Sequence, residues 1–159
     1  MRVKIFRPAV LFSVFFASTS LLLSKVDLEV SKQSYFTARD FQRIPEFFSG
    51  EEYRGGKIYC RSNPKEREGF YFVVTIPKIA EKIARSIYWQ LKWISPLDPA
   101  MQTIKIPMEE PKFFGKEIFI GLTGKDWPEP TVRPLAWHLC LMEGQDTVIA
   151  ESQSFLWSK

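Results

Sequence analysis

Beyond residue 50, apolar side chains recur at every second position along several short runs of the chain. The clearest run is RSIYWQLKWI at residues 85–94, where one parity is held by Ile87, Trp89, Leu91 and Trp93. Tyrosine, glutamine and lysine occupy the positions between them. Because successive side chains of a β-strand point to opposite faces of a sheet, this run predicts a strand with one buried and one solvated face.

Six further runs show similar alternation and are separated by turn-forming residues. They cover residues 57–62, 69–76, 102–107, 116–122, 135–142 and 147–157. Seven short strands in roughly a hundred residues are typical of an all-β antiparallel sandwich or barrel, not of alternating strands and helices. We expect the core between two facing sheets, around Trp89, Trp93 and Trp137, and the connection EGQD at residues 143–146 predicts a hairpin.

This plan resembles an antiparallel immunoglobulin-like or fibronectin-type β-sandwich over residues 52–157. The resemblance is to an architecture and matches no family motif. Trp89 and Trp93 lie between Cys60 and Cys140, but the parities of the two cysteines disagree, so the Cys, Trp, Cys arrangement of immunoglobulin domains is not reproduced. The resemblance therefore implies a fold, with the sandwich domain at residues 51–159, and carries over no functional residue.

Cys60 and Cys140 are the only cysteines of the chain. In an exported protein such a pair invites a disulfide, which would close a long loop and restrict the unfolded chain. Cys60 shares the parity of Ile58, whereas Cys140 lies opposite the apolar row of its own run. Because disulfide geometry is strict, both interpretations stay open: a bridge between Cys60 and Cys140, or two separate thiols.

Residues 77–86, with the sequence PKIAEKIARS, depart from the strand pattern. Isoleucines and alanines each recur at a spacing of four residues, and Pro77 is acceptable in a first helical turn. A helix of one or two turns between the sheets and a plain loop are the two alternatives.

Residues 25–50 show no sustained period and are interpreted as an amino-terminal arm. A linker, a short helix around residues 37–42 and an edge strand are the alternatives for its structure. Its phenylalanines, Phe41, Phe47 and Phe48, indicate that the arm docks on the domain, because disordered segments are poor in aromatic residues.

Three aromatic residues, Tyr71, Tyr88 and Phe119, lie on the parity opposite to the predicted core rows. They are expected to form an outer aromatic strip. Either another molecule or the arm of the same chain could cover this strip, and the pattern favours the arm.

The first 24 residues combine a short basic head, Arg2, Lys4 and Arg7, with an uncharged run from residue 8 to residue 24. This arrangement is typical of a secretory signal, which we expect to end near residue 20. The alternative is an uncleaved anchor reaching residue 24, although the run is slightly short for a spanning helix of about 20 apolar residues. We therefore expect export to the periplasm or cell surface, with membrane contact only through this segment.

The formal charge of +4 does not indicate binding to nucleic acid. Three of the 22 basic residues lie in the amino-terminal segment, and without them the basic residues outnumber the 18 acidic ones by one. The remaining basic residues alternate with acids and do not form the basic stripe that binds phosphates. Nucleic acid is therefore excluded as a partner.

The stretch GLTGK at residues 121–125 is similar to the end of a nucleotide-binding loop. That motif, G-x-x-x-x-G-K-[ST], would require glycine at Phe119 and a hydroxyl at Asp126. Both requirements fail. The stretch instead predicts a strand that ends in a turn, at which Gly124 allows backbone geometry that a Cβ would obstruct.

Catalytic chemistry finds little support in the sequence. His138 is the only histidine, which excludes zinc sites with several histidines. His138 and Cys140 share one face of a predicted strand, but no third, orienting group can be assigned. Acidic pairs such as Glu51 and Glu52 are interpreted as solvated charges. We expect no catalytic residue, no cofactor and no metal.

The candidate contact residues are aromatic. Trp127 lies in the predicted turn, Phe113 and Phe114 precede a strand, and Tyr88 lies on an outer face. Such rings can anchor a protein or stack on a sugar, whereas Trp127 could instead cap the sandwich. The sequence predicts an exported, non-catalytic module that binds a protein or cell-envelope partner or is structural. A polysaccharide-binding module and a small secreted hydrolase are the alternatives.

Overall fold

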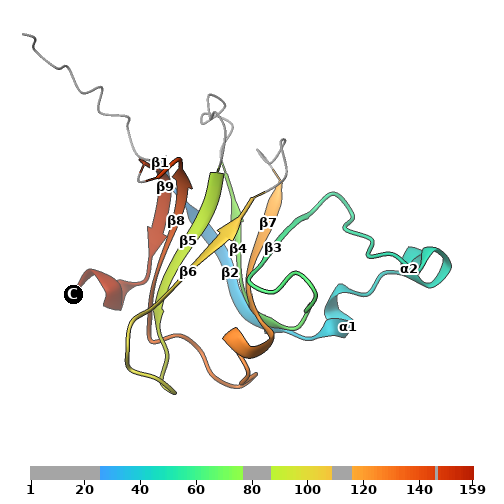
Figure 1. Cartoon of the computed structure of the whole chain (residues 1–159), viewed down its shortest axis with the longest axis horizontal. Helices are drawn as coiled ribbons and strands as arrows, with labels where there is room; N and C mark the ends of the chain where they lie inside the picture. The colour runs from blue at the N-terminus through green and yellow to red at the C-terminus, as the bar shows by residue number, and fades with distance from the viewer. Residues whose placement is uncertain (1–25, 77–86, 109–115, 146) are drawn as a thin grey trace, which may run out of the picture.

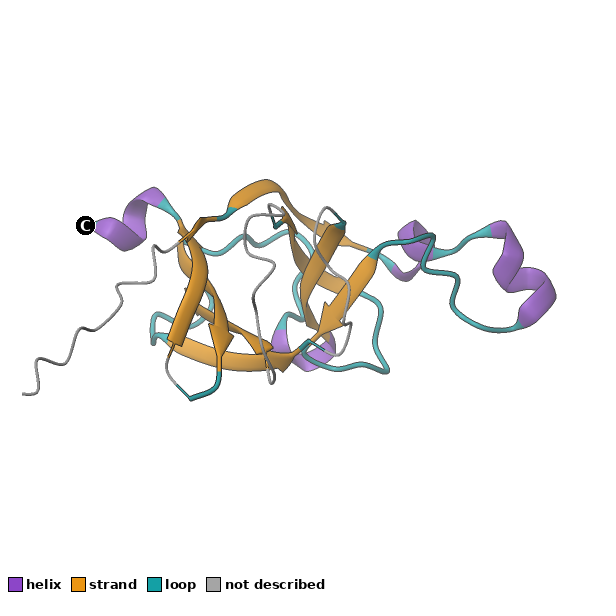
Figure 2. Ribbon diagram, turned by 90° about the horizontal axis from the view of Figure 1, so that it is seen from above, coloured by secondary structure: helices purple, strands orange, loops and turns teal. Residues whose placement is uncertain are grey.

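A computed structural model of the chain describes residues 26–76, 87–108, 116–145 and 147–159. Two β-sheets face each other, and a segment with two short helices projects from one side (Figures 1 and 2). The strands are β1 Val26–Asp27, β2 Glu29–Phe36, β3 Ile58–Arg61, β4 Gly69–Thr75, β5 Ile87–Ile94, β6 Gln102–Pro107, β7 Glu117–Thr123, β8 Ala136–Glu143 and β9 Thr147–Gln153. The helices are α1 Ala38–Phe41 and α2 Ile44–Ser49, with short 3-10 turns η2 Gly124–Asp126 and η3 Phe155–Ser158.

The sheets are mixed. One sheet has the strand order β1-β9-β8-β5-β6 and the other has the order β2-β4-β7-β3. Most neighbours are antiparallel, as predicted, but β1 runs parallel to β9 and β3 runs parallel to β7. The expectation of purely antiparallel sheets is therefore wrong at these two edges. Each parallel pair joins strands that are far apart in sequence, so no tight hairpin dictates their relative direction.

All seven predicted strands are present. Two further strands, β1 and β2, are edge strands within residues 25–50, where an edge strand was one of the alternatives, and α1 agrees with the short helix considered around residues 37–42. The run 147–157 forms a shorter strand than expected, because the chain leaves the sheet after Gln153 and turns into η3. β2 shows no sustained period because its register shifts between Val30 and Lys32, so that an extra residue interrupts the alternation. Val30 and Tyr35 consequently both pack against the core although they differ in parity.

The core lies between the two sheets, as the alternation predicts. Trp89, Trp93 and Trp137 are buried there together with the isoleucines and leucines of the facing rows. β4 is buried along nearly its whole length, since the other sheet covers its inner face and the projecting segment covers its outer face.

Two predicted turns are confirmed. β7 ends in η2, where Gly124 has a positive φ of 60°, so residues 121–125 turn the chain and do not form a phosphate loop. β8 and β9 are adjacent and antiparallel, and Gly144 between them has a φ of 64°. The helix considered at residues 77–86 lies outside the described residues.

Candidate functional site

Residues 26–36 of the predicted arm form β1 and β2, and the name arm is used below for residues 37–57 only. This arm docks on the outer face of the four-stranded sheet through the phenylalanine Phe41. Phe41 of α1 is buried and packs on Tyr71 of β4, with ring centroids 5.0 Å apart. Its ring also meets Tyr59 edge-on at 5.4 Å and Phe119 at 6.3 Å. The predicted cover of the outer strip is therefore confirmed for Tyr71 and Phe119, and Phe41 provides it.

Tyr88 does not belong to this strip, because it lies in β5 of the other sheet. Its hydroxyl donates a hydrogen bond to the carbonyl of Gln145 at 3.0 Å, and the Lys105 ammonium lies 5.0 Å from its ring centroid. Tyr88 is half-buried and engaged within its own sheet.

Tyr71 fits beneath Phe41 because the neighbouring strand lacks a side chain at Gly121. A Cβ on Gly121 would overlap the Tyr71 ring. Gly121, the first glycine of the GLTGK stretch, therefore leaves space for the Tyr71 ring of the neighbouring strand, which is a packing role.

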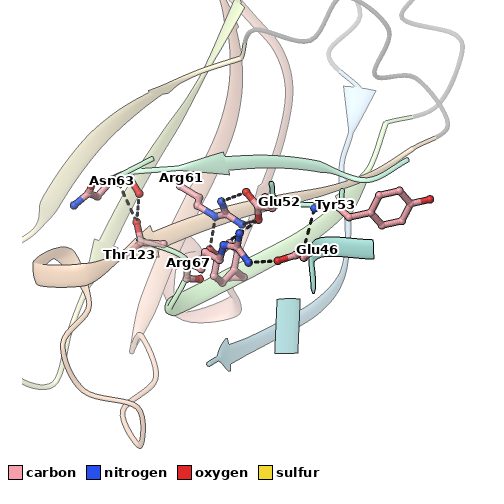
Figure 3. A network of polar contacts seen from close by, with 8 residues as sticks. Glu46, Glu52, Tyr53, Arg61, Asn63, Arg67 and Thr123 are labelled. Carbon is pink, nitrogen blue, oxygen red and sulfur yellow. Dashed lines mark hydrogen bonds and ion pairs between the residues drawn. The ribbon is translucent and has the colours of Figure 1, made fainter. Parts of the chain in front are cut away.

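A buried arginine lies beside these rings and binds the arm. Arg61 of β3 donates from Nη1 and Nη2 to the two carboxylate oxygens of Glu52, at 2.9 and 2.5 Å (Figure 3). Its Nε donates to the Tyr71 hydroxyl at 2.9 Å, and that hydroxyl donates to the Arg67 carbonyl at 2.6 Å. The guanidinium carbon lies 4.9 Å from the Tyr59 ring centroid. Arg61 therefore combines a bidentate ion pair with stacking, which a lysine could not reproduce.

The pKa values in this network follow from burial and pairing. The Arg61 hydrogen bond holds the pKa of Glu52 below its ordinary value. Burial opposes the charge of Arg61, but hydrogen bonds with Glu52 and Tyr71 leave its pKa raised. Burial raises the pKa of Tyr71 to about 12. Glu52 and Arg61 are thus both charged in the folded protein at neutral pH, with only 18% and 5% of their side chains exposed.

A second ion pair holds α2. Arg67, in the loop between β3 and β4, donates from Nη1 to Glu46 of α2 at 2.7 Å (Figure 3). The other oxygen of Glu46 accepts the Tyr53 backbone N–H at 3.2 Å. The Arg67 hydrogen bond holds the pKa of Glu46 below its ordinary value.

The loop that carries Arg67 is fixed to the end of β7 by a buried threonine. Thr123 Oγ1 accepts the backbone N–H of Asn63 at 2.9 Å and donates to the Asn63 carbonyl at 3.0 Å. These bonds fix the position of the loop and therefore of Arg67. The ion pair between Arg67 and Glu46 in turn positions α2 relative to the sandwich.

The apolar side chains of α2 point into solvent. Ile44, Phe47 and Phe48 are 75%, 79% and 87% exposed. Both views show α2 at the far end of the projecting arm, away from the two sheets (Figures 1 and 2). A hollow separates α2 from the sandwich and is lined by Ala38, Gln42, Glu46, Phe47, Gly50 and Arg67. The expectation that Phe47 and Phe48 help to dock the arm is therefore wrong, because the ties of α2 are polar.

Of the contact residues predicted from sequence, Trp127 is buried in the structure. Trp127 is only 3% exposed and packs on Phe70, with ring centroids 5.2 Å apart, so it caps the sandwich and is not a surface ring. Phe113 and Phe114 lie outside the described residues. The acidic residue Glu52, interpreted as a solvated charge, is instead the partner of Arg61.

No disulfide joins the two cysteines, which lie in different sheets. Cys60 belongs to the core cluster, whereas Cys140 lies on the outer face of the five-stranded sheet beside His138. The two cysteines have opposite parities in their strands, so Cys60 faces the core while Cys140 faces outward, and the two thiols lie apart.

His138 and Cys140 are joined by an acid that the sequence did not indicate. His138 Nε2 lies 3.0 Å from Glu151 Oε2 and 3.3 Å from Cys140 Sγ. In a nucleophilic relay, thiol and carboxylate occupy opposite nitrogens of the imidazole. Here the carboxylate approaches Nε2, and the sulfur is also nearer to Nε2 than to Nδ1, which lies 3.8 Å from it, so the cluster does not have the geometry of a hydrolase triad.

Sequence reasoning missed Glu46, Glu52, Arg61 and Arg67 as one network. One signal was available: Arg61 continues the predicted strand 57–62 at a position where its side chain lies beside the outer aromatic strip. Nothing local to residues 44–48 distinguishes apolar side chains that dock from apolar side chains that project.

Among the described residues, no helix has the length and apolar character needed to cross a lipid bilayer. Comparison with known proteins gives no match to any family model, to any curated protein or to any solved structure. The functional argument therefore rests on the arm and its contacts.

Proposed function

We propose that this chain is a non-catalytic binding module that inserts the apolar side chains of α2 into a groove of a partner protein. The observation that carries the proposal is the orientation of α2. Glu46 is tied back to the sandwich while Ile44, Phe47 and Phe48 face solvent. A monomer with no partner would gain free energy by turning these side chains inward, because large exposed apolar groups are unfavourable in water.

The spacing of the exposed side chains fits this mode of recognition. Ile44, Phe47 and Phe48 occupy positions i, i+3 and i+4 of one helix. These positions lie on one face of a helix and are the anchors that amphipathic helices place into hydrophobic grooves. The helix ends are defined as well, since Gly50 has a left-handed φ of 71° and its N–H bonds to the Glu46 carbonyl at 2.9 Å.

The expected affinity is modest. Burying one large apolar side chain contributes about 1.5 to 3 kcal/mol, so the three anchors together contribute roughly 5 to 9 kcal/mol. Association itself costs an estimated 4 to 15 kcal/mol in lost freedom, which offsets most of that gain. The largest net gain is then about 5 kcal/mol, so we expect these anchors alone to give a reversible interaction with a dissociation constant of about 0.1 mM or weaker, and a tighter one where the partner adds polar contacts at the rim.

A protein groove fits better than a membrane or a polysaccharide. β1, which follows the amino-terminal segment, and α2 lie on opposite sides of the sandwich in both views (Figures 1 and 2). Trp127, the ring on which the polysaccharide alternative relied, is buried.

Export of the chain and an immunoglobulin-like topology are part of the same proposal. The basic head and apolar run of residues 1–24 support export, and the mass of the mature amino terminus tests it. In the immunoglobulin fold, strands B and E share one sheet and strands C, F and G share the other. In this chain β4 and β7 share one sheet, as strands B and E do, and β5, β8 and β9 share the other, as strands C, F and G do. β3 departs from the immunoglobulin arrangement because it runs parallel to β7.

Photo-crosslinking tests the proposal. A benzophenone amino acid replaces Phe48 in the full chain, which is expressed in its own cells, illuminated and purified. A synthetic peptide of residues 37–53 competes, and a matched peptide with serine at positions 44, 47 and 48 serves as control. Each peptide is present during illumination. We expect one discrete protein adduct, whose formation the native peptide prevents and the serine peptide does not.

The same probe at Leu97, which is 61% exposed in the connection between β5 and β6, controls for general surface contact. An adduct of equal mass at both positions would overturn the proposal. So would lipid or glycan adducts at position 48, or a protein adduct that the native peptide fails to displace. An adduct of twice the chain mass would assign α2 to self-association and overturn the separate partner.

A further inference from the structure

The outer face of the five-stranded sheet carries the cluster His138, Cys140 and Glu151. His138 and Cys140 follow each other on the outer face of β8, and Glu151 of β9 is the register partner of Cys140. Their ligand atoms all lie within 4.8 Å of one another. The cluster lies on the other sheet from the arm's docking face, so it is independent of the proposed binding function.

The three side chains converge on one point. Glu151 Oε2 is 3.0 Å and Cys140 Sγ is 3.3 Å from the same His138 nitrogen, Nε2. The sulfur and the carboxylate oxygen are 3.9 Å apart. Each residue thus presents one ligand atom to a shared space, an arrangement that suits a bound cation better than a chain of proton transfers.

We propose that His138, Cys140 and Glu151 bind a divalent transition metal of the zinc class. Zinc is held tetrahedrally at about 2.3 Å from sulfur and about 2.0 to 2.1 Å from nitrogen or oxygen. Tetrahedral angles then require ligand atoms about 3.3 to 3.6 Å apart. The separations of 3.0, 3.3 and 3.9 Å lie within a few tenths of an ångström of these values. Because Cys140 Sγ is also 3.8 Å from His138 Nδ1, the imidazole must rotate to direct its Nε2 lone pair between the sulfur and the carboxylate.

The chemistry of the donors selects the class of metal. Thiolate and imidazole favour zinc, cobalt, nickel and copper, whereas magnesium and calcium prefer oxygen ligands alone. A thiolate and a carboxylate together neutralise a divalent charge at a site where Cys140 is buried. Three protein ligands leave one coordination position for water or an external group.

The surroundings hold the imidazole in place. Trp157 of η3 stacks on the His138 ring, with centroids 5.7 Å apart and planes inclined by 28°. On the neighbouring strand β5, Gln90 faces Cys140 and Lys92 faces His138 in register. Lys92 is the cation nearest in register and opposes metal binding, whereas Gln90 is neutral.

Cobalt substitution tests the site in the untagged full chain. Co²⁺ bound through a thiolate gives a near-ultraviolet charge-transfer band, and tetrahedral coordination gives intense visible bands. We expect both bands to saturate at one equivalent and to be displaced by one equivalent of Zn²⁺. Cys140→Ser should abolish the charge-transfer band, and Glu151→Gln should weaken Zn²⁺ binding at least 10-fold in a chelator competition.

Cys60→Ala is the matched control, because it removes the other thiol and should leave both bands unchanged. Circular dichroism of each variant shows whether the sandwich is intact. Absence of any thiolate band in the native chain would overturn the proposal. Bands that survive Cys140→Ser, or Zn²⁺ affinity unchanged by Glu151→Gln in a folded protein, would overturn it equally.

Discussion

Replacement of Phe41 by alanine should release the arm while the sandwich stays folded. The ring is buried and lies within 5.0 to 6.3 Å of four aromatic rings, those of Phe36, Tyr59, Tyr71 and Phe119. Truncation of a buried phenylalanine typically costs about 3 to 5 kcal/mol. Because α2 contributes no buried side chain, little else opposes detachment beyond the ion pairs of Glu46 and Glu52.

The matched control is Phe48→Ala on the same arm. Phe48 is 87% exposed, so the same substitution should change stability by no more than about 0.5 kcal/mol. The two variants delete identical atoms, and any difference between them reports the environment of the ring. Phe41→Ala should therefore lose at least about 3 kcal/mol of arm docking, a factor of roughly 100 in the docking equilibrium.

Hydrogen exchange with mass spectrometry measures the docking locally, and urea unfolding followed by tryptophan fluorescence measures the core. In Phe41→Ala, amides of residues 38–53 should exchange roughly 100-fold faster, while strands β5 and β8 keep most of their protection. Equal exchange in Phe41→Ala and Phe48→Ala would refute the reasoning. So would a cooperative loss of the whole fold in Phe41→Ala with no separate release of the arm.

Three further predictions concern the polar network. Glu52→Gln should lower the free energy of unfolding by about 1.5 to 3 kcal/mol, because it removes a charged hydrogen-bond partner of Arg61. The Arg61 hydrogen bond lowers the pKa of Glu52 in the folded protein, so the pair stabilises fully above the ordinary pKa range of a glutamate and loses this stabilisation as pH falls from that range through the lowered folded-state pKa. Urea midpoints of the variant should lack this acid-side loss. Burial raises the pKa of Tyr71 to about 12, so its stabilising contribution is intact below pH 10 and is lost as pH rises toward 12. Burial also raises the pKa of Tyr35 to about 12, so an ultraviolet titration should show at least two tyrosines ionising late, and Tyr71→Phe should remove one of them. Thr123→Val should cost about 1 to 3 kcal/mol, because it leaves the Asn63 N–H without its acceptor, and thermal melts measure this loss.

Local alternation was sufficient to predict the strands and the core. Runs such as residues 85–94 display their buried row directly, since period and face depend only on the pleat of one strand. The same parity placed Tyr71 and Phe119 on the outer face and led to the arm as their cover. Sheet order and parallel edges could not be predicted in this way, because they depend on which distant strands pair.

The ion pair of Arg61 and Glu52 was missed for a related reason. A charged residue at the end of a predicted strand reads as solvated unless the element that covers it is known. Here the arm returns over β3 and buries both charges. The outward direction of α2 is likewise invisible in its sequence, since it follows from the tie of Glu46 to Arg67.

Register shifts in β2 and β9 interrupt the two-residue alternation within those strands. In β9, Ile149 is the extra residue, because Leu141 pairs with Ala150 while Met142 pairs with Val148. Without that shift, Glu151 would lie opposite Leu139 and would point into the core. With it, Glu151 faces outward beside Cys140.

A bulge therefore places the one carboxylate that completes the cluster with His138. A buried glutamate among core side chains would carry a large desolvation penalty, so the same single-residue insertion both protects the core and creates the outer site. The shift in β2 acts in a comparable way by turning both Val30 and Tyr35 toward the core. In both strands the facing of the side chains changes at the inserted residue, so a strict two-residue period continued through it would assign the residues beyond it to the wrong face.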